Sequence, residues 1–187
     1  MRGVTLAEPR DEQDTTTVLE GKISIVCVFT GTWAERQAAS FFDGNEKLHK
    51  VLDVGKEVIQ RVDVNIEENK MKAGLIQLFM GGIRKKLPEE QHPKYFLVRK
   101  GVTDDMRHNM GIFNSQVGYV YLLDSKCRIR WAGNAEAESG EKESLVVCIK
   151  RLVQELKKRQ TERDAFEEGV AVEAIGSVHN AVSAIVV

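Results

Sequence analysis

The residues best placed for chemistry lie where a strongly apolar segment gives way to a polar loop. Residues 22–29 (KISIVCVF) are apolar and β-branched, which is typical of a strand buried on both faces. Thiol oxidoreductases place a nucleophilic cysteine just after such a strand, because the N–H groups at the start of the next helix stabilise a thiolate. Residues 30–35 (TGTWAE) contain no cysteine, so this loop is not a dithiol redox site.

The same loop carries a helix-start signal and an aromatic side chain. Thr32 and Glu35 have the Thr-x-x-Glu spacing of a capping box, which predicts a helix with Thr32 as its cap. Trp33 lies where the thiolate of an oxidoreductase would be. Apolar residues then recur at helical spacing as far as Leu48, with Gly44 as a weak point.

The three cysteines, Cys27, Cys127 and Cys148, form no C-x-x-C pair and no zinc-ligand spacing. An odd number without a disulfide framework is typical of a reducing compartment. Cys27 lies inside the apolar strand, where burial would raise its pKa. Cys148 falls on the apolar stripe of the last helix. Cys127, at a predicted turn, leaves one alternative open: a thioredoxin-like or peroxiredoxin-like thiol oxidoreductase.

Composition narrows the class of protein. The 187 residues suffice for one domain, and a formal net charge of -1 argues against a generic nucleic-acid binder. No apolar run approaches the roughly 20 residues that span a bilayer. The first residues do not form an Arg-rich import signal. Phosphate-loop, nucleophile-elbow and metal motifs are missing from the sequence, so we expect no enzyme and no cofactor.

The remaining elements alternate between strand and helix patterns. Residues 58–65 alternate apolar and polar side chains as a strand does, and residues 67–86 place Met71, Leu75 and Phe79 on one helical face. The later elements are a strand at 95–98, a helix at 103–112 capped by Thr103, a β-hairpin from 118–124 and 128–133, and an amphipathic helix over 141–163.

This order predicts an α/β fold of thioredoxin-like architecture. It would be a three-layer sandwich with a central mixed sheet, an inserted helix near 67–86 and a C-terminal helix. Residues 1–20 are expected to be a flexible lead-in, 21–163 the domain, and 164–187 a variable tail that either docks as a further amphipathic helix or hangs free.

Basic residues gather at 84–86 and recur at Lys94, Arg99 and Lys100. One interpretation is favourable charge at a helix C-terminus, and the other is contact with anionic lipid or an acidic partner.

Three blocks together resemble a known family. They are residues 24–42 (SIVCVFTGTWAERQAASFF), 94–101 (KYFLVRKG) and 114–146, in which GYVYLLD followed by RIRWAG is the most specific part. They are similar to the mitochondrial F1Fo ATP synthase assembly factor family, known chiefly from fungi, over roughly residues 20–160. The resemblance implies a thioredoxin-like fold without redox chemistry. It also implies a chaperone that binds newly made Fo subunit 6 (subunit a) and aids its incorporation with the proteolipid ring.

The resemblance further implies a location on the matrix side of the mitochondrial inner membrane. We also expect peripheral contact with that membrane, and no small-molecule or nucleic-acid partner. The candidate partner-contact or framework residues are Trp33, Glu35, Met71, Leu75, Phe79, Arg84, Tyr121, Asp124, Arg130 and Trp131.

Overall fold

The central strand of the sheet is the apolar segment found in the sequence. A computed structural model describes residues 1–8 and 12–185, without the side chains of 70, 72, 73, 75–79 and 164–185. β3 (Ile23–Phe29) is buried at every position. The other strands are β1 (Arg2–Thr5), β2 (Glu12–Asp14), β4 (Ile59–Ile66), β5 (Tyr95–Val98), β6 (Tyr119–Leu123) and β7 (Ile129–Asn134).

The seven strands form one mixed sheet in the order β2-β1-β5-β4-β3-β6-β7. β3, β4 and β5 run parallel to one another, whereas β6 pairs antiparallel with β3 and with β7, and β1 pairs antiparallel with β5 and with β2. The helices are α1 (Thr16–Leu19), α2 (Gly31–Ser40), α3 (Glu46–Val54), α4 (Lys70–Lys86), the 3-10 helix η1 (Glu89–Lys94), α5 (Asp104–Asn109) and α6 (Ser139–Ile185). From β3 onward, strand and helix alternate as the sequence predicts.

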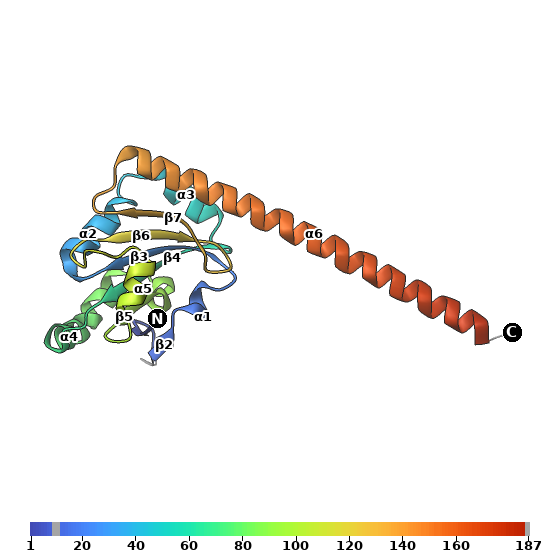
Figure 1. Cartoon of the computed structure of the whole chain (residues 1–187), viewed down its shortest axis with the longest axis horizontal. Coiled ribbons are helices and arrows are strands. Elements are labelled where there is room, and N and C mark those ends of the chain that lie inside the picture. Colours follow the sequence, from blue (N-terminus) through green and yellow to red (C-terminus); the bar gives the residue numbers. More distant parts are fainter. Residues whose placement is uncertain (9–11, 186–187) are drawn as a thin grey trace. The chain divides into compact units, whose positions relative to one another are not determined.

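Alternate residues of each strand face opposite sides of the sheet. One side carries an apolar cluster, covered by Leu19 of α1 and by Val102 and Ile112 on either side of α5. Its members from the sheet are Val26, Val28, Val62, Val64, Ile66, Phe96, Val98, Tyr119, Tyr121 and Leu123. α2 and α3 cover the other side (Figure 1).

Residues 1–20 are not a lead-in outside the domain, so that expectation is wrong. β1 pairs with β5 through Val4 and Leu97, and β2 extends the sheet beyond β1. Leu6 is fully buried, and its N–H donates to the carbonyl of His92 at 3.1 Å. The polar composition hid these strands because a short strand needs only two or three apolar residues to join a sheet.

The start of α2 also differs from the sequence prediction. The helix begins at Gly31 with Thr30 as its N-cap, and Thr30 makes no side-chain capping bond. Thr32 therefore lies within the first turn instead of capping it, so the capping-box prediction is wrong. The predicted single helix is broken at Gly44, which has φ +66°, and α3 starts anew with Asn45 accepting from the N–H of Leu48.

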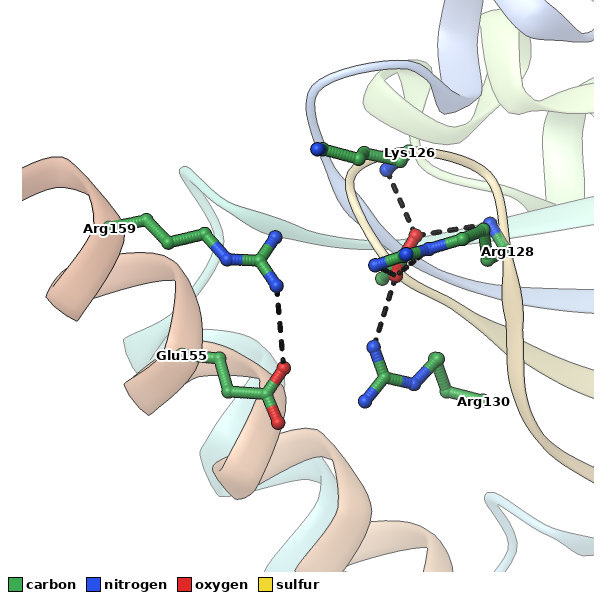
Figure 2. A network of polar contacts seen from close by, with 6 residues as sticks. Lys126, Arg128, Arg130, Glu155 and Arg159 are labelled. Carbon is green, nitrogen blue, oxygen red and sulfur yellow. Dashed lines mark hydrogen bonds and ion pairs between the residues drawn. The ribbon is translucent and has the colours of Figure 1, made fainter. Parts of the chain in front are cut away.

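The chain divides into two units, Met1–Lys150 and Arg151–Val187. Within the first unit, the opening turns of α6 bury Leu145, Val146 and Ile149. α6 continues to Ile185, so the predicted helix end near 163 is wrong. Within the second unit, ion pairs one helical turn apart join Glu155 to Arg159 at 3.9 Å, drawn in Figure 2, and Lys158 to Glu162 at 3.8 Å.

Candidate functional site

The first turn of α2 presents Trp33 to solvent. Its side chain is 67% exposed, while Ala34 and Ala38 beneath it are fully buried. The segment before β6 packs against this turn, and the N–H of Gly118 donates to Oε1 of Gln37 at 3.0 Å. A Cβ at position 118 would overlap the carbonyl oxygen of Ala34. Only glycine therefore lets this segment approach α2 so closely, and the approach fixes the position of the Trp33 turn.

A charged cluster lies under α2 on the sheet. Nη2 of Arg61 is 2.8 Å from Oδ1 of Asp63, and Nε2 of Gln91 donates to Oδ2 of Asp63 at 2.9 Å. Asp63 is 3% exposed. The Arg61 guanidinium also lies 4.2 Å from the centre of the Phe42 ring. Each oxygen of the buried carboxylate thus has a partner, and the cluster fixes η1 against β4.

This cluster sets the electrostatics of two nearby groups. Burial raises the pKa of the Cys27 thiol far above its usual range, because Cys27 lies beside Asp63 in the β3–β4 register and is completely buried. Burial also raises the pKa of Glu35, and the Asp63 carboxylate raises it further. Glu35 is half-buried in the first turn of α2. The raised pKa keeps the Cys27 thiol protonated, which is the opposite of an activated thiol.

A pocket of about 330 Å³ opens at the carboxyl ends of β3 and β4. It is lined by Thr30, Ile66, Glu67, Glu68, Asn69, Arg107, Ile112, Phe113 and Ser115. The side chain of Phe113 is 78% exposed. Arg107 pairs with Glu68 at 2.9 Å across this pocket. The carboxyl edge of parallel strands is where open α/β sheets place ligands.

The predicted contact residues of α4 are only partly described. Met71 is 81% exposed near the start of the helix. The side chains of Leu75 and Phe79 lie outside the described residues. Arg84 forms an ion pair with Glu8 at 2.7 Å, so one charge of the predicted basic cluster is already matched within the chain.

The hairpin of β6 and β7 is held by one carboxylate, shown in Figure 2. Oδ1 of Asp124 accepts from the N–H groups of Lys126 and Arg128, both at 3.0 Å, while Oδ2 lies 2.7 Å from Arg128 and 3.2 Å from Arg130. Burial by itself would raise the pKa of Asp124, but these bonds outweigh it and lower the pKa to about 2. The structure brings Asp124 and Arg130 together as a turn lock.

Two further hairpin residues point into the protein. The hydroxyl of Tyr121 donates to the carbonyl of Met110 at 2.8 Å, and burial raises its pKa. Nε1 of Trp131 donates to Oγ of Ser144 at 3.0 Å, and its ring meets Phe41 edge-on at 5.7 Å. Trp131 thus joins β7 to α6 and α2, whereas Trp33 faces solvent. A role in partner contact stays a prediction for all these residues.

The cysteines show no arrangement for redox chemistry within the described part of the chain. All three are free, and burial, with Glu20 and Asp124 nearby, raises the pKa of Cys127. Cys127 has φ +57° in the hairpin turn and packs against the apolar cluster. Among the described residues, groups of histidine, cysteine and carboxylate side chains that could hold a metal ion are absent, as are helices long and apolar enough to cross a membrane.

Sequence reasoning missed the charged cluster and the pocket. The signal for Arg61 and Asp63 was present in the alternation of residues 58–65, but alternation alone suggests a solvated face instead of a buried one. Glu67, at the start of the helix predicted over 67–86, is 6% exposed. Burial of these groups depends on α2 and η1 folding over the strand, which no local pattern reveals.

Comparison with solved structures supports the fold. The chain is similar to the solution structure of an uncharacterized thioredoxin-like protein from Porphyromonas gingivalis, at 17% identity and a TM-score of 0.50, over 84% of this chain and 90% of that one. This likeness concerns architecture alone. The thioredoxin-like prediction, with its central mixed sheet, is confirmed.

Comparison of sequences identifies the family. The chain is 31% identical over 141 residues to the "Mitochondrial ATPase complex subunit ATP10" of Eremothecium gossypii, covering 74% of this chain and 51% of the relative. It is 30% identical over 159 residues to the protein of the same name from Saccharomyces cerevisiae, covering 79% and 57%. The chain thus spans about half the length of these relatives. Because the family model described as "ATP10 protein" matches residues 1–152, the resemblance found in the sequence is confirmed, and the chain belongs to the ATP10 protein family.

Proposed function

We propose that this chain is an assembly factor of the mitochondrial F1Fo ATP synthase. It binds newly made Fo subunit 6 (subunit a) and holds it until it joins the proteolipid ring. The observation that carries the proposal is membership of the ATP10 protein family, whose curated relatives are named as mitochondrial ATPase complex subunits. The proposal applies to the region this chain shares with them.

The geometry of α2 supports a binding role in place of a redox one. The helix start carries an exposed Trp33 where an oxidoreductase would carry its thiolate. Exposed aromatic side chains commonly anchor protein interfaces. Three large apolar side chains are exposed. Trp33 lies shortly after β3, Met71 lies shortly after β4, and Phe113 lines the pocket. We assign these three side chains to client contact.

Within the proposal, the protein works on the matrix side of the inner membrane and contacts the membrane peripherally. Lys85 and Lys86 are exposed at the end of α4, where their charge can attract anionic headgroups. Arg84 contributes less because Glu8 already pairs with it.

Site-specific photo-crosslinking in isolated mitochondria tests the proposal. A photoreactive benzophenone residue replaces Trp33 in one variant of the full chain and Val54 in the control, because Val54 is 82% exposed on α3, away from the pocket. After labelling of mitochondrial translation products, we expect subunit 6 to cross-link through position 33 and not through position 54. Cross-links from position 33 to other proteins without subunit 6 would refute the proposed client.

The alternative function is a thioredoxin-like or peroxiredoxin-like oxidoreductase that uses Cys127. An oxidoreductase needs its thiols, whereas the proposed assembly factor does not. A variant combining Cys27→Ala, Cys127→Ser and Cys148→Ser, expressed in cells lacking the native chain, is expected to support normal ATP synthase assembly on native gels. Lost assembly with an unchanged circular dichroism spectrum would favour the oxidoreductase.

A further inference from the structure

The pocket at the carboxyl ends of β3 and β4 is lined by a largely buried glutamate, Glu67, and one oxygen of its carboxylate has no partner among the described residues. Glu67 follows β4, and its N–H donates to the carbonyl of Val98 at 2.9 Å, which fixes its backbone. Its side chain is 6% exposed, and Oε1 accepts from the N–H of Asn69 at 3.0 Å. Oε2 has no hydrogen-bond or ion-pair partner among the residues that the structure describes.

The basic group in the pocket is already engaged. Arg107 is 19% exposed in its side chain and pairs with Glu68 at 2.9 Å. The walls thus hold two carboxylates and one guanidinium, and among the described residues Glu67 has no ion-pair partner. A cation that enters the pocket can therefore pair with the Glu67 carboxylate and donate a hydrogen bond to its second oxygen.

The other walls indicate what kind of cation fits. Thr30 and Ser115 provide hydroxyl oxygens as further acceptors, whereas Ile66 and Ile112 provide apolar surface for an alkyl stem. A guanidinium has five N–H donors in one plane, so it suits several acceptors better than a compact ammonium does. The exposed ring of Phe113 adds an aromatic face on which a guanidinium can stack.

We propose that this pocket binds an arginine side chain of a partner polypeptide, with Glu67 as its counter-ion. Exposed apolar side chains flank the walls along the chain: Trp33 comes three residues after Thr30, and Met71 two residues after Asn69. The arginine therefore belongs to an otherwise apolar segment. The inference deepens the proposed function and rests on it for the partner's identity. The pocket chemistry is tested without any mitochondrial component.

The test is a titration of the purified, ¹⁵N-labelled full chain followed by amide chemical shifts. Three probes share one alkyl stem: n-butylguanidinium, n-butylammonium and the neutral n-butylurea. We expect n-butylguanidinium to shift the amides of Glu67, Asn69 and Phe113 and to bind about fivefold more tightly than n-butylurea, the gain of a modest charge pair. Equal binding of these two probes would overturn the proposal. Binding of n-butylammonium as tight as that of n-butylguanidinium would overturn the arginine assignment in favour of an amine such as a lipid headgroup.

Variants then locate the counter-ion. Glu67→Gln keeps an oxygen that accepts from the Asn69 N–H but removes the charge, so we expect its affinity for n-butylguanidinium to fall to that for n-butylurea. Glu90→Gln, at an exposed position of η1 outside the pocket, is the matched control and should bind as the original chain does. Unchanged affinity in Glu67→Gln would refute the role of Glu67. If a variant fails to fold, the three-probe comparison on the unaltered chain still decides whether the pocket selects a guanidinium.

Discussion

Single charged residues in this protein act mainly through the backbone that they fix. Asp124 binds two backbone N–H groups and two guanidinium groups across one turn, and Asp63 binds Arg61 and Gln91 under α2. In both cases each oxygen of a buried carboxylate has a donor, while the partner guanidinium groups stay partly exposed, so removing the donors would leave a buried carboxylate unmatched. Glu67 differs, because one of its oxygens has no such partner among the described residues.

The turn lock predicts how stability depends on pH. The pKa of Asp124 falls from 3.8 to about 2 on folding. The contribution of Asp124 to the free energy of unfolding is therefore complete above its pKa in the unfolded chain, and it is lost as pH falls toward 2. A shift of this size corresponds to about 2 kcal/mol. We expect Asp124→Asn to lower the free energy of unfolding by about 2 kcal/mol at pH 7, measured by urea denaturation, and to flatten the acid dependence between pH 5 and 2.

Asp53→Asn is the control, because Asp53 is exposed on α3. It should leave both the stability at pH 7 and the acid dependence as they are. If the free energy of unfolding of Asp124→Asn falls with pH in parallel with that of the unaltered chain down to pH 2, Asp124 does not stabilise the turn as proposed.

At the scale of elements, close packing between α2 and β6 places the first turn of α2. Gly118 allows the contact, and Gln37 fixes it by accepting the Gly118 N–H. On the other side of the turn, Ala34 and Ala38 are small enough to lie directly on the sheet. The exposed position of Trp33 is thus a consequence of what lies beneath α2.

A single methyl group tests this packing. Gly118→Ala should lower the free energy of unfolding by about 1–3 kcal/mol, because its Cβ overlaps the backbone of Ala34. It should also change the fluorescence of Trp33 by displacing the turn. Gly140→Ala is the matched control, since its Cβ would meet no atom within 4 Å in the helix α6. That change should be neutral or stabilising by at most about 1 kcal/mol. Equal effects of the two substitutions would exclude the close approach as the cause.

For the whole molecule, the two ends of the chain contribute unequally to the folded core. The N-terminal strands belong to the sheet, and the described members of the apolar cluster lie within Met1–Lys150. The N-terminal end is therefore needed for the fold.

Two truncations compare the ends. Deleting residues 2–15 removes β1 and β2, uncovers the edge of β5 and exposes the surface that Val4 and Leu6 bury. We expect this deletion to cost about 3 kcal/mol or more and to promote aggregation through the open edge. Deleting residues 164–187 should change stability by less than about 0.5 kcal/mol. Thermal unfolding followed by circular dichroism at 222 nm measures the stability change of each deletion. A larger loss of stability from the C-terminal deletion than from the N-terminal one would refute the claim that the N-terminal end matters more for the fold.

Elements with a strong local pattern were predictable. The strand at 95–98 has the predicted bounds, β3 begins one residue later than predicted, and β6 is shorter than predicted by one residue at each end. Thr103 caps α5 by accepting from the N–H of Met106, as predicted. Each of these depends on a continuous apolar run or on a capping residue beside its helix. β1 and β2 were missed because they are short and polar, and they form only where β5 offers them an edge.

The sequence by itself determined the class of fold, the family and the absence of a thiol at the start of α2. These follow from the order of periodic segments and from residue identities, which are local properties. Only the tertiary structure decided that Trp33 is exposed and Trp131 half-buried, that Asp63 has matched partners, and that Glu67 lies in a pocket with one oxygen unmatched among the described residues. Burial and charge pairing depend on residues that are distant in sequence and adjacent in space, so they are set only when the sheet, α2 and η1 come together.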